Sequence, residues 1–83
     1  MDSLNVVMKS RKKTYYEGPA DTVSSINDTG PFDILPQHAN FITMIKDNIV
    51  FKIPGEDTPQ KFEISKGVMR VYENSVNIYL TVS

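Results

Sequence analysis

The chain has 83 residues, no cysteine and a formal net charge of −1, which suits one small domain, because folding units usually take ~100–150 residues. The absence of cysteine excludes disulfides, thiolate zinc sites and thiol nucleophiles. The near-neutral charge argues against a protein whose main partner is a polyanion, since phosphate neutralisation needs a basic surface. Apolar runs are far shorter than the ~20 residues that cross a bilayer.

Alternation with period two, which indicates half-buried strands, begins at the N-terminus. Leu4, Val6 and Met8 occupy alternate positions and predict the first strand. After a turn at 11–13, the adjacent Tyr15 and Tyr16 lie on a strand, so one ring faces the core and the other faces away from it. Turns are also expected at 17–19 and 27–31, where Gly, Pro, Asn and Asp gather.

The second half of the sequence continues this pattern. A single helical turn at 38–46 is an alternative, but the neighbouring pattern favours a strand there. Further strands and the turns at 54–57, 66–67 and 73–75 follow from alternating pairs and triplets: Ile49, Phe51 and Ile53; Phe62 and Ile64; Met69 and Val71; Val76, Ile78, Leu80 and Val82. Turns about 8–12 residues apart are typical of antiparallel sandwiches and barrels. The sequence therefore predicts one all-β domain over residues 1–83, a β-sandwich of about 9–10 short, mostly antiparallel strands.

No catalytic motif is present. The serines lack the Gly-x-Ser-x-Gly context of a serine nucleophile, and no glycine-rich nucleotide-binding motif occurs. His38 is the only histidine, so a metal site is not expected, since catalytic zinc sites usually gather several imidazoles. We expect no enzymatic activity and no cofactor, and we interpret His38 as a half-exposed side chain bonded to nearby backbone, with a proton switch or an interface contact as alternatives.

Four of the nine basic residues are Lys9, Arg11, Lys12 and Lys13, beside the two tyrosines. Cations and rings together are typical of sites for single-stranded nucleic acid. A hydrated loop between the first two strands explains the lysines as well, and only one of the two rings can stack on a ligand from a given face.

Residues 30–39 read Gly-Pro-Phe-Asp-Ile-Leu-Pro-Gln-His-Ala. This segment resembles the Gly-(acidic)-x-Gly-Ile-Leu-Pro-Gly-His-Ala signature of the epsilon subunit of F-type ATP synthases. Upstream, 16–23 is similar to the family's Tyr-x-Gly-x-Ala-x-x-Val pattern. Downstream, 62–71 with 76–78 is similar to its Val-Ser-Gly-Gly-Phe-x-Glu-Val and Val-Thr-Val segments. The resemblance covers nearly the whole chain.

The resemblance implies the N-terminal β-sandwich domain of that subunit, a non-catalytic part of the rotor's central stalk, on the cytoplasmic or matrix face of an energy-transducing membrane. It implies two partners, the gamma subunit and the c-ring, with no nucleic acid and with membrane contact only through the ring. The c-ring-facing loop corresponds to Asp28, Thr29, Gly30, Pro31, Phe32 and Asp33. The gamma-facing residues correspond to Met8, Lys9, Ser10, Arg11, His38, Phe41, Ile42 and Thr43.

The sequence departs from the family pattern at Pro31, Asp33, Gln37 and Asn40. The family's C-terminal helical hairpin has no counterpart in these residues, so ATP sensing and rotor inhibition are not expected of them. Two alternatives to the rotor function stay open at this point. One is a related β-domain recruited as a stand-alone adaptor, and the other is a small β-barrel that binds single-stranded nucleic acid.

Overall fold

Seven strands and no helix make up residues 3–81, the part of the chain that the computed structural model describes. They form one sheet in the order β2-β1-β7-β6-β5-β3-β4. Every neighbouring pair is antiparallel except β1 with β7. The strands are β1 (Leu4–Lys9), β2 (Thr14–Ala20), β3 (Thr22–Asn27), β4 (Gly30–Ile34), β5 (Phe41–Lys52), β6 (Gln60–Tyr72) and β7 (Ser75–Leu80).

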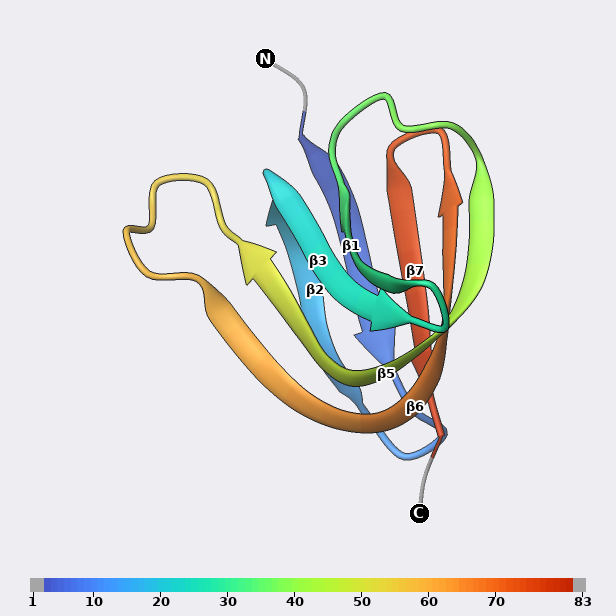
Figure 1. Cartoon of the computed structure of the whole chain (residues 1–83). Helices are drawn as coiled ribbons and strands as arrows, with labels where there is room; N and C mark the ends of the chain where they lie inside the picture. The colour runs from blue at the N-terminus through green and yellow to red at the C-terminus, as the bar shows by residue number, and fades with distance from the viewer. Residues whose placement is uncertain (1–2, 82–83) are drawn as a thin grey trace.

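The sheet folds over itself because β5 and β6 curve through the middle of the molecule (Figure 1). One half of each long strand lies in the layer with β7, β1 and β2, and the other half lies in the layer with β3 and β4. The prediction of an all-β fold of mostly antiparallel strands is confirmed. The strand number is seven rather than nine or ten, because β5 and β6 are 12 and 13 residues long and each runs through both layers.

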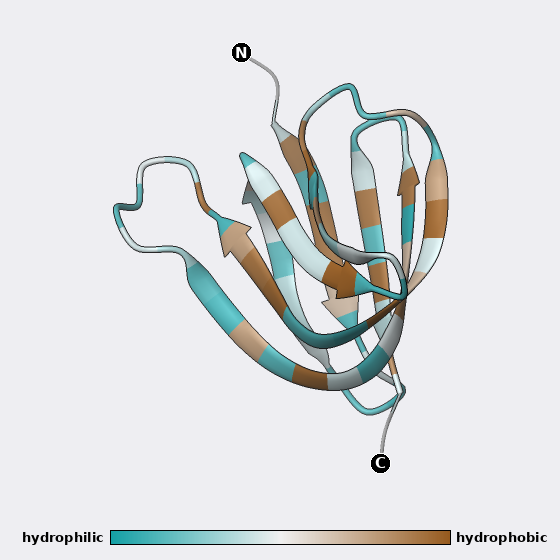
Figure 2. Cartoon of the chain, in the orientation of Figure 1, coloured by the Kyte–Doolittle hydropathy of each residue, from teal (hydrophilic) through white to brown (hydrophobic). Residues whose placement is uncertain are grey.

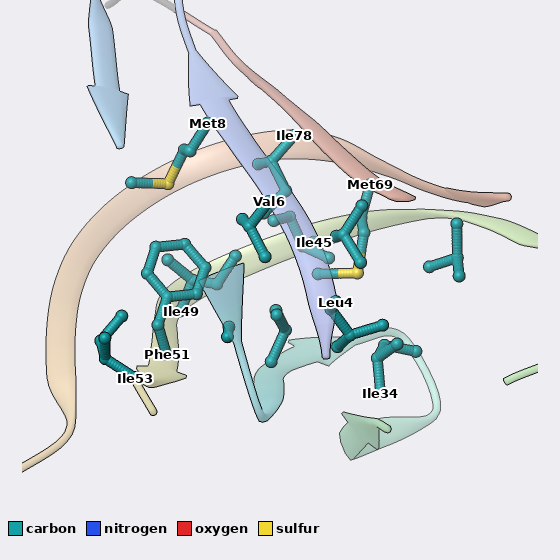
Figure 3. Packing of buried hydrophobic residues seen from close by; sticks show 14 residues of the cluster. Leu4, Val6, Met8, Ile34, Ile45, Ile49, Phe51, Ile53, Met69 and Ile78 are labelled. Atoms are coloured by element: carbon teal, nitrogen blue, oxygen red, sulfur yellow. The ribbon is translucent and has the colours of Figure 1, made fainter. Parts of the chain in front are cut away.

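The core lies between the two layers and is filled from all seven strands, of which the edge strands β2 and β4 each bury only their last residue, Ala20 and Ile34. Figure 2 shows the alternation of apolar and polar residues along the strands, and Figure 3 shows the apolar side chains converging on one interior. This alternation is the pattern expected when one face of each strand is buried. The larger buried side chains are Leu4, Val6, Met8, Val23, Ile34, Ile45, Ile49, Phe51, Met69, Val71, Val76 and Ile78. The expectation for Val82 lies outside the described residues.

The bend of the two long strands has an identifiable cause. The register between β5 and β6 shifts between Lys46 and Asp47, and Asp47 has a left-handed backbone with φ of 70°. The register leaves Ser65 of β6 without a partner on β5. Two residues further along β6, Gly67 is buried beside β7, where an added Cβ would lie 3.0 Å from the carbonyl oxygen of Tyr79. The predicted turn at 66–67 is therefore wrong: Gly67 stays within β6 and lets β7 approach closely, a common use of glycine inside strands.

The predicted turn at 17–19 is also wrong, because these residues lie within β2. Pro19 is tolerated there since β2 is an edge strand, whose outer side needs no N–H donor. Tyr16 holds this stretch: its ring lies 4.8 Å from that of Phe51, and its hydroxyl donates to the carbonyl of Pro19 at 2.6 Å. Tyr15 is 40% exposed, so the two rings face opposite sides as predicted.

Burial raises the pKa of the Tyr16 hydroxyl above its usual 10.0, and the charge of Glu56 raises it further. Because the pKa of Tyr16 is higher in the folded than in the unfolded state, folding favours the protonated hydroxyl. The hydroxyl therefore contributes fully to stability below about pH 10, and this contribution is lost as the pH rises through the folded-state pKa. We expect Tyr16→Phe to lower the free energy of unfolding at pH 7 by about 1 kcal/mol and to flatten its fall above pH 10. Urea unfolding at pH 8 and pH 11 measures both effects; an equal alkaline fall in both proteins would contradict this role.

The remaining turns agree with the sequence. Residues 41–52 form a strand rather than a helical turn, and chain reversals occur at 11–13, 28–29, 54–57 and 73–74. In the last of these, Glu73 and Asn74 have positive φ of 47° and 66°, which matches a tight two-residue hairpin turn.

Candidate functional site

The hairpin between β3 and β4 projects a short tip formed by Asp28 and Thr29. Gly30, which follows, has φ of 118°, a conformation that favours glycine. Asn27 shapes the tip: its Oδ1 accepts hydrogen bonds from the backbone N–H of Thr29 at 3.0 Å and from the Thr29 hydroxyl at 2.7 Å. This arrangement is the turn expected of an Asn side chain that bonds its own backbone two residues on.

Two contacts connect this tip to β5. The Nδ2 of Asn27 donates to the Thr43 hydroxyl at 3.2 Å. Lys46 Nζ lies 4.0 Å from a carboxylate oxygen of Asp28, whose side chain is fully exposed. The tip is therefore held against the long bent strand, although its ion pair is too exposed to contribute much stability.

The sequence analysis expected a loop over the whole c-ring-facing set, but Gly30, Pro31, Phe32 and Asp33 belong to strand β4. Phe32 is half-buried, with its ring 5.9 Å from that of Phe41 in an edge-to-face contact. Asp33 is exposed and accepts a hydrogen bond from the Ser24 hydroxyl at 2.6 Å. Within this set, the exposed positions are Asp28, Thr29, Pro31 and Asp33.

The segment 35–40, which includes the second half of the stretch 30–39 that resembles the family signature, is hydrogen-bonded to the β6–β7 turn. The backbone N–H of Gln37 donates to Asn74 Oδ1 at 2.6 Å, and that of Glu73 donates to Asn40 Oδ1 at 3.2 Å. His38 is half-buried, with Nδ1 2.7 Å from the carbonyl oxygen of Ala39 and its ring 5.5 Å from that of Phe41. This agrees with a histidine bonded to nearby backbone.

A second surface lies on the side of β1, β7, β6 and β5 that points away from the core. We call it the outward face and define it by two rows of paired residues and Tyr72, which lies beyond them on β6. One row is Lys9, Tyr79, Val68 and Met44, and the other is Val7, Asn77, Arg70 and Ile42. Paired residues of neighbouring strands point to the same side, so these side chains share one surface.

The outward face exposes four large side chains that are apolar or aromatic. Ile42 is 67% exposed, Met44 is 65% exposed, and Tyr72 and Tyr79 are about half exposed. Two cations lie over rings on this face: Lys9 Nζ is 5.5 Å from the Tyr79 ring centroid, and the Arg70 guanidinium is 5.8 Å from that of Tyr72. Exposed aliphatic and aromatic groups with Arg are the composition of protein-binding surfaces.

The structure brings together only part of the gamma-facing set. Lys9 and Ile42 lie on the outward face, in neighbouring rows. Phe41 and Thr43 alternate to the other side of β5 and are half-buried. Met8 is a correction: its side chain is fully buried in the core, so it cannot contact a partner of the folded domain.

The other members of this set lie at two ends of the molecule. Ser10 and Arg11 follow the last residue of β1. His38 lies in the segment bonded to Asn74, whose carbonyl accepts the N–H of Asn5 at the start of β1. The six residues of β1 span roughly 20 Å at ~3.3 Å per residue, so these members lie at opposite ends of β1.

Sequence reasoning missed most of the outward face. Met44, Arg70, Tyr72 and Tyr79 lie on it but were not in the predicted set. The signal was available in part, because Tyr79 alternates with the core residues Ile78 and Leu80. A large apolar residue at a strand position that alternates with core residues indicates a candidate contact surface.

Within residues 3–81, no three His, Asp or Glu side chains gather as metal ligands would, and no helix is long and apolar enough to span a bilayer. The basic turn at 11–13 places Lys13 Nζ 4.7 Å from the centroid of the Tyr15 ring. That ring is therefore already partly covered by a cation of the same chain.

Comparison with known proteins gives one family. A family model described as the β-sandwich domain of the ATP synthase delta/epsilon chain matches residues 3–81. An ATP synthase epsilon chain of Clostridium botulinum is 28% identical over 67 residues, which cover 81% of this chain and 50% of that protein. The chain thus spans about half the length of this curated relative.

Two solved assemblies contain chains of the same fold. A chain in the Euglena gracilis mitochondrial ATP synthase superposes with a TM-score of 0.86 at 14% identity, covering 94% of this chain and 50% of that one. A chain in the central stalk and c-ring of the Tetrahymena thermophila enzyme gives 0.83 at 11% identity, covering 98% and 65%. With the family model matching nearly every residue, the chain belongs to the β-sandwich domain family of the ATP synthase delta and epsilon chains.

Proposed function

We propose that this domain is a non-catalytic central-stalk component of a rotary ATP synthase, where it joins the gamma subunit to the c-ring. Family membership supports this function, and both structural relatives come from ATP synthase assemblies that include the c-ring. The observation that carries the proposal is the outward face, where Ile42 and Met44 are each about two-thirds exposed. Such side chains gain free energy when a partner covers them.

The gamma subunit covers the outward face in this proposal. Ile42, Met44, Tyr72 and Tyr79 supply the apolar anchors, and Lys9 and Arg70 supply rim charges. Of the residues that the resemblance assigns to gamma, Lys9 and Ile42 make direct contact. Phe41 and Thr43 support β5 from its inner side, while Ser10, Arg11 and His38 lie outside the outward face, near the two ends of β1.

The c-ring meets the β3–β4 tip. Asp28, Thr29, Pro31 and Asp33 present side chains to the ring, while Gly30 shapes the turn and Phe32 anchors β4 against Phe41. The Asn27–Thr43 bond joins this tip to β5, which also carries the gamma contact. A displacement of one partner is thus passed to the other through a hydrogen-bonded, densely packed body. The domain reaches the membrane only through the ring, on its cytoplasmic or matrix side.

The experiment is reconstitution with the gamma subunit and c-ring of the same organism. The isolated domain should co-elute with gamma in gel filtration, and the pair should bind detergent-solubilised c-rings more tightly than gamma alone does. Failure to bind gamma would overturn the proposal. Binding to oligonucleotides that weakens steeply with salt would instead favour the nucleic-acid alternative.

We expect the double change Asp28→Ala with Pro31→Ala to weaken binding to the c-ring about tenfold, by ~1.4 kcal/mol, and not to weaken gamma binding. Both side chains are exposed at the tip, so their loss removes contacts without opening the core. A titration of c-rings with the labelled domain–gamma pair measures the change.

The matched control is Asp57→Ala with Pro59→Ala, the same residue types in the exposed β5–β6 connection, which should bind rings like the native domain. Equal binding by both double variants would show that the tip does not touch the ring. Phe32→Ala is unsuitable for this test, because Phe32 packs on Phe41 and its loss would lower stability as well.

A further inference from the structure

Two lysines face each other directly at the bulged end of the outward face. Lys46 on β5 and Lys66 on β6 are Cα partners, one row beyond Met44 and Val68. Side chains at such positions have Cβ atoms about 5 Å apart, and like charges directly opposite are destabilising. The pair therefore works against the stability of the free domain.

The chain compensates this repulsion only weakly. Lys46 has a carboxylate oxygen of Asp28 at 4.0 Å, but the Asp28 side chain is fully exposed, where an ion pair contributes little. Among residues 3–81, no carboxylate forms an ion pair with Lys66. The two ammonium groups therefore have one weakly paired carboxylate between them.

The two lysines also share a shallow hollow with the apolar part of the outward face. It is lined by Asp28, Met44, Ile45, Lys46 and Lys66. Met44 belongs both to this hollow and to the row that the partner would cover. A protein that packs on Met44 must therefore approach both ammonium groups and remove part of their water, which is unfavourable unless an opposite charge replaces it.

We infer that the protein that covers the outward face places a carboxylate between Lys46 and Lys66. This inference rests on the proposed function, in which that protein is the gamma subunit. The carboxylate replaces the weak contact of Lys46 with Asp28 and gives Lys66 its ion pair. The contact sets the register of docking along β5 and β6, because it lies at one end of the outward face, one row beyond Met44 and Val68, and charges fix register more than affinity.

Lys66→Gln tests the inference with an effect of opposite sign on binding and on stability. Removing one like charge should leave the free energy of unfolding equal or higher, whereas gamma binding should weaken about tenfold. Lys66→Glu should weaken gamma binding further. Binding of the Lys66→Glu variant should recover when the facing carboxylate residue of gamma is changed to lysine. Lys61→Gln, on the other half of β6 and paired at 3.8 Å with Glu63, is the control and should bind like the native domain.

Calorimetric titration of gamma with each variant separates the outcomes. If Lys66→Gln binds gamma like the native domain while Ile42→Asp does not bind, the inference is overturned and the proposed function stands. If neither change affects gamma binding, gamma does not contact the outward face, and the inference is overturned although the domain still binds gamma. If Lys66→Gln weakens binding to the c-ring and not to gamma, the carboxylate belongs to the ring, and the inference is overturned.

Discussion

Ile42→Asp is expected to weaken binding of the gamma subunit by about 100-fold or more, equivalent to ~2.7 kcal/mol, while the domain stays folded. Ile42 is 67% exposed, so the carboxylate remains hydrated in the free domain. In the complex, the same carboxylate loses its water within a largely apolar contact, and its cross-strand pairing with Arg70 on β6 offsets only part of that loss. Calorimetric titration with gamma measures the affinity.

The matched control is Leu35→Asp. Leu35 is also an exposed aliphatic residue, at 54%, but it lies in the segment after β4 rather than on the outward face. Its replacement should leave gamma binding within a factor of two. Equal losses in the two variants would mean that the effect is not specific to the outward face.

Gly67→Val is expected to lower the free energy of unfolding by about 3 kcal/mol, a large fraction of the ~5–10 kcal/mol available to a small domain. A Cβ at this position would lie 3.0 Å from the Tyr79 carbonyl oxygen and 3.1 Å from the Leu80 side chain. The first neighbour is backbone, so β7 itself must move away. Because β7 connects β6 to β1, the shift spreads across the sheet. Urea unfolding measures the loss.

Ser65→Val serves as the control for Gly67→Val. Ser65 lies two positions before it on the same strand and is exposed, so valine there should change stability by less than about 0.5 kcal/mol. A native-like unfolding midpoint for Gly67→Val would show that β6 and β7 can move apart with little loss of stability. The explanation that Gly67 is needed for the close approach of β7 would then be wrong.

The fold class was predictable because the buried residues alternate without interruption in most strands. Leu4, Val6 and Met8 in β1, and Val76 and Ile78 in β7, are all fully buried as their spacing predicts. Period-two patterning survives in the structure because each strand has one face on the core. The same argument identified β5 over a helical turn.

Two predicted turns are wrong because tertiary packing, rather than local sequence, determines the structure at those positions. Gly67 and Pro19 are common turn residues, but Gly67 lies where β7 approaches β6 and Pro19 lies on an edge strand. Neither environment is visible in a short window of sequence. The bend at Lys46 and Asp47 likewise depends on pairing with β6, which sequence spacing alone does not define.

The candidate site was only partly predictable. Near the start of β5, Ile42, Met44 and Ile45 are all apolar, so spacing does not tell which side faces the core. The structure buries Ile45 and exposes Ile42 and Met44. The resemblance included Ile42, which is exposed, but it could not show that Met8 is internal or that Tyr79 lies beside Lys9.

The parallel pairing of β1 with β7 has a consequence for synthesis of the chain. Among the described strands, β1 pairs only with β2 and β7, so the N-terminal hairpin has no backbone partner in the rest of the sheet until β7 is present. During translation, β1 and β2 must wait until residues 75–80 leave the ribosome. Until then Val6 and Met8 have no completed interior, so the nascent domain closes in one late step rather than from its N-terminus onward.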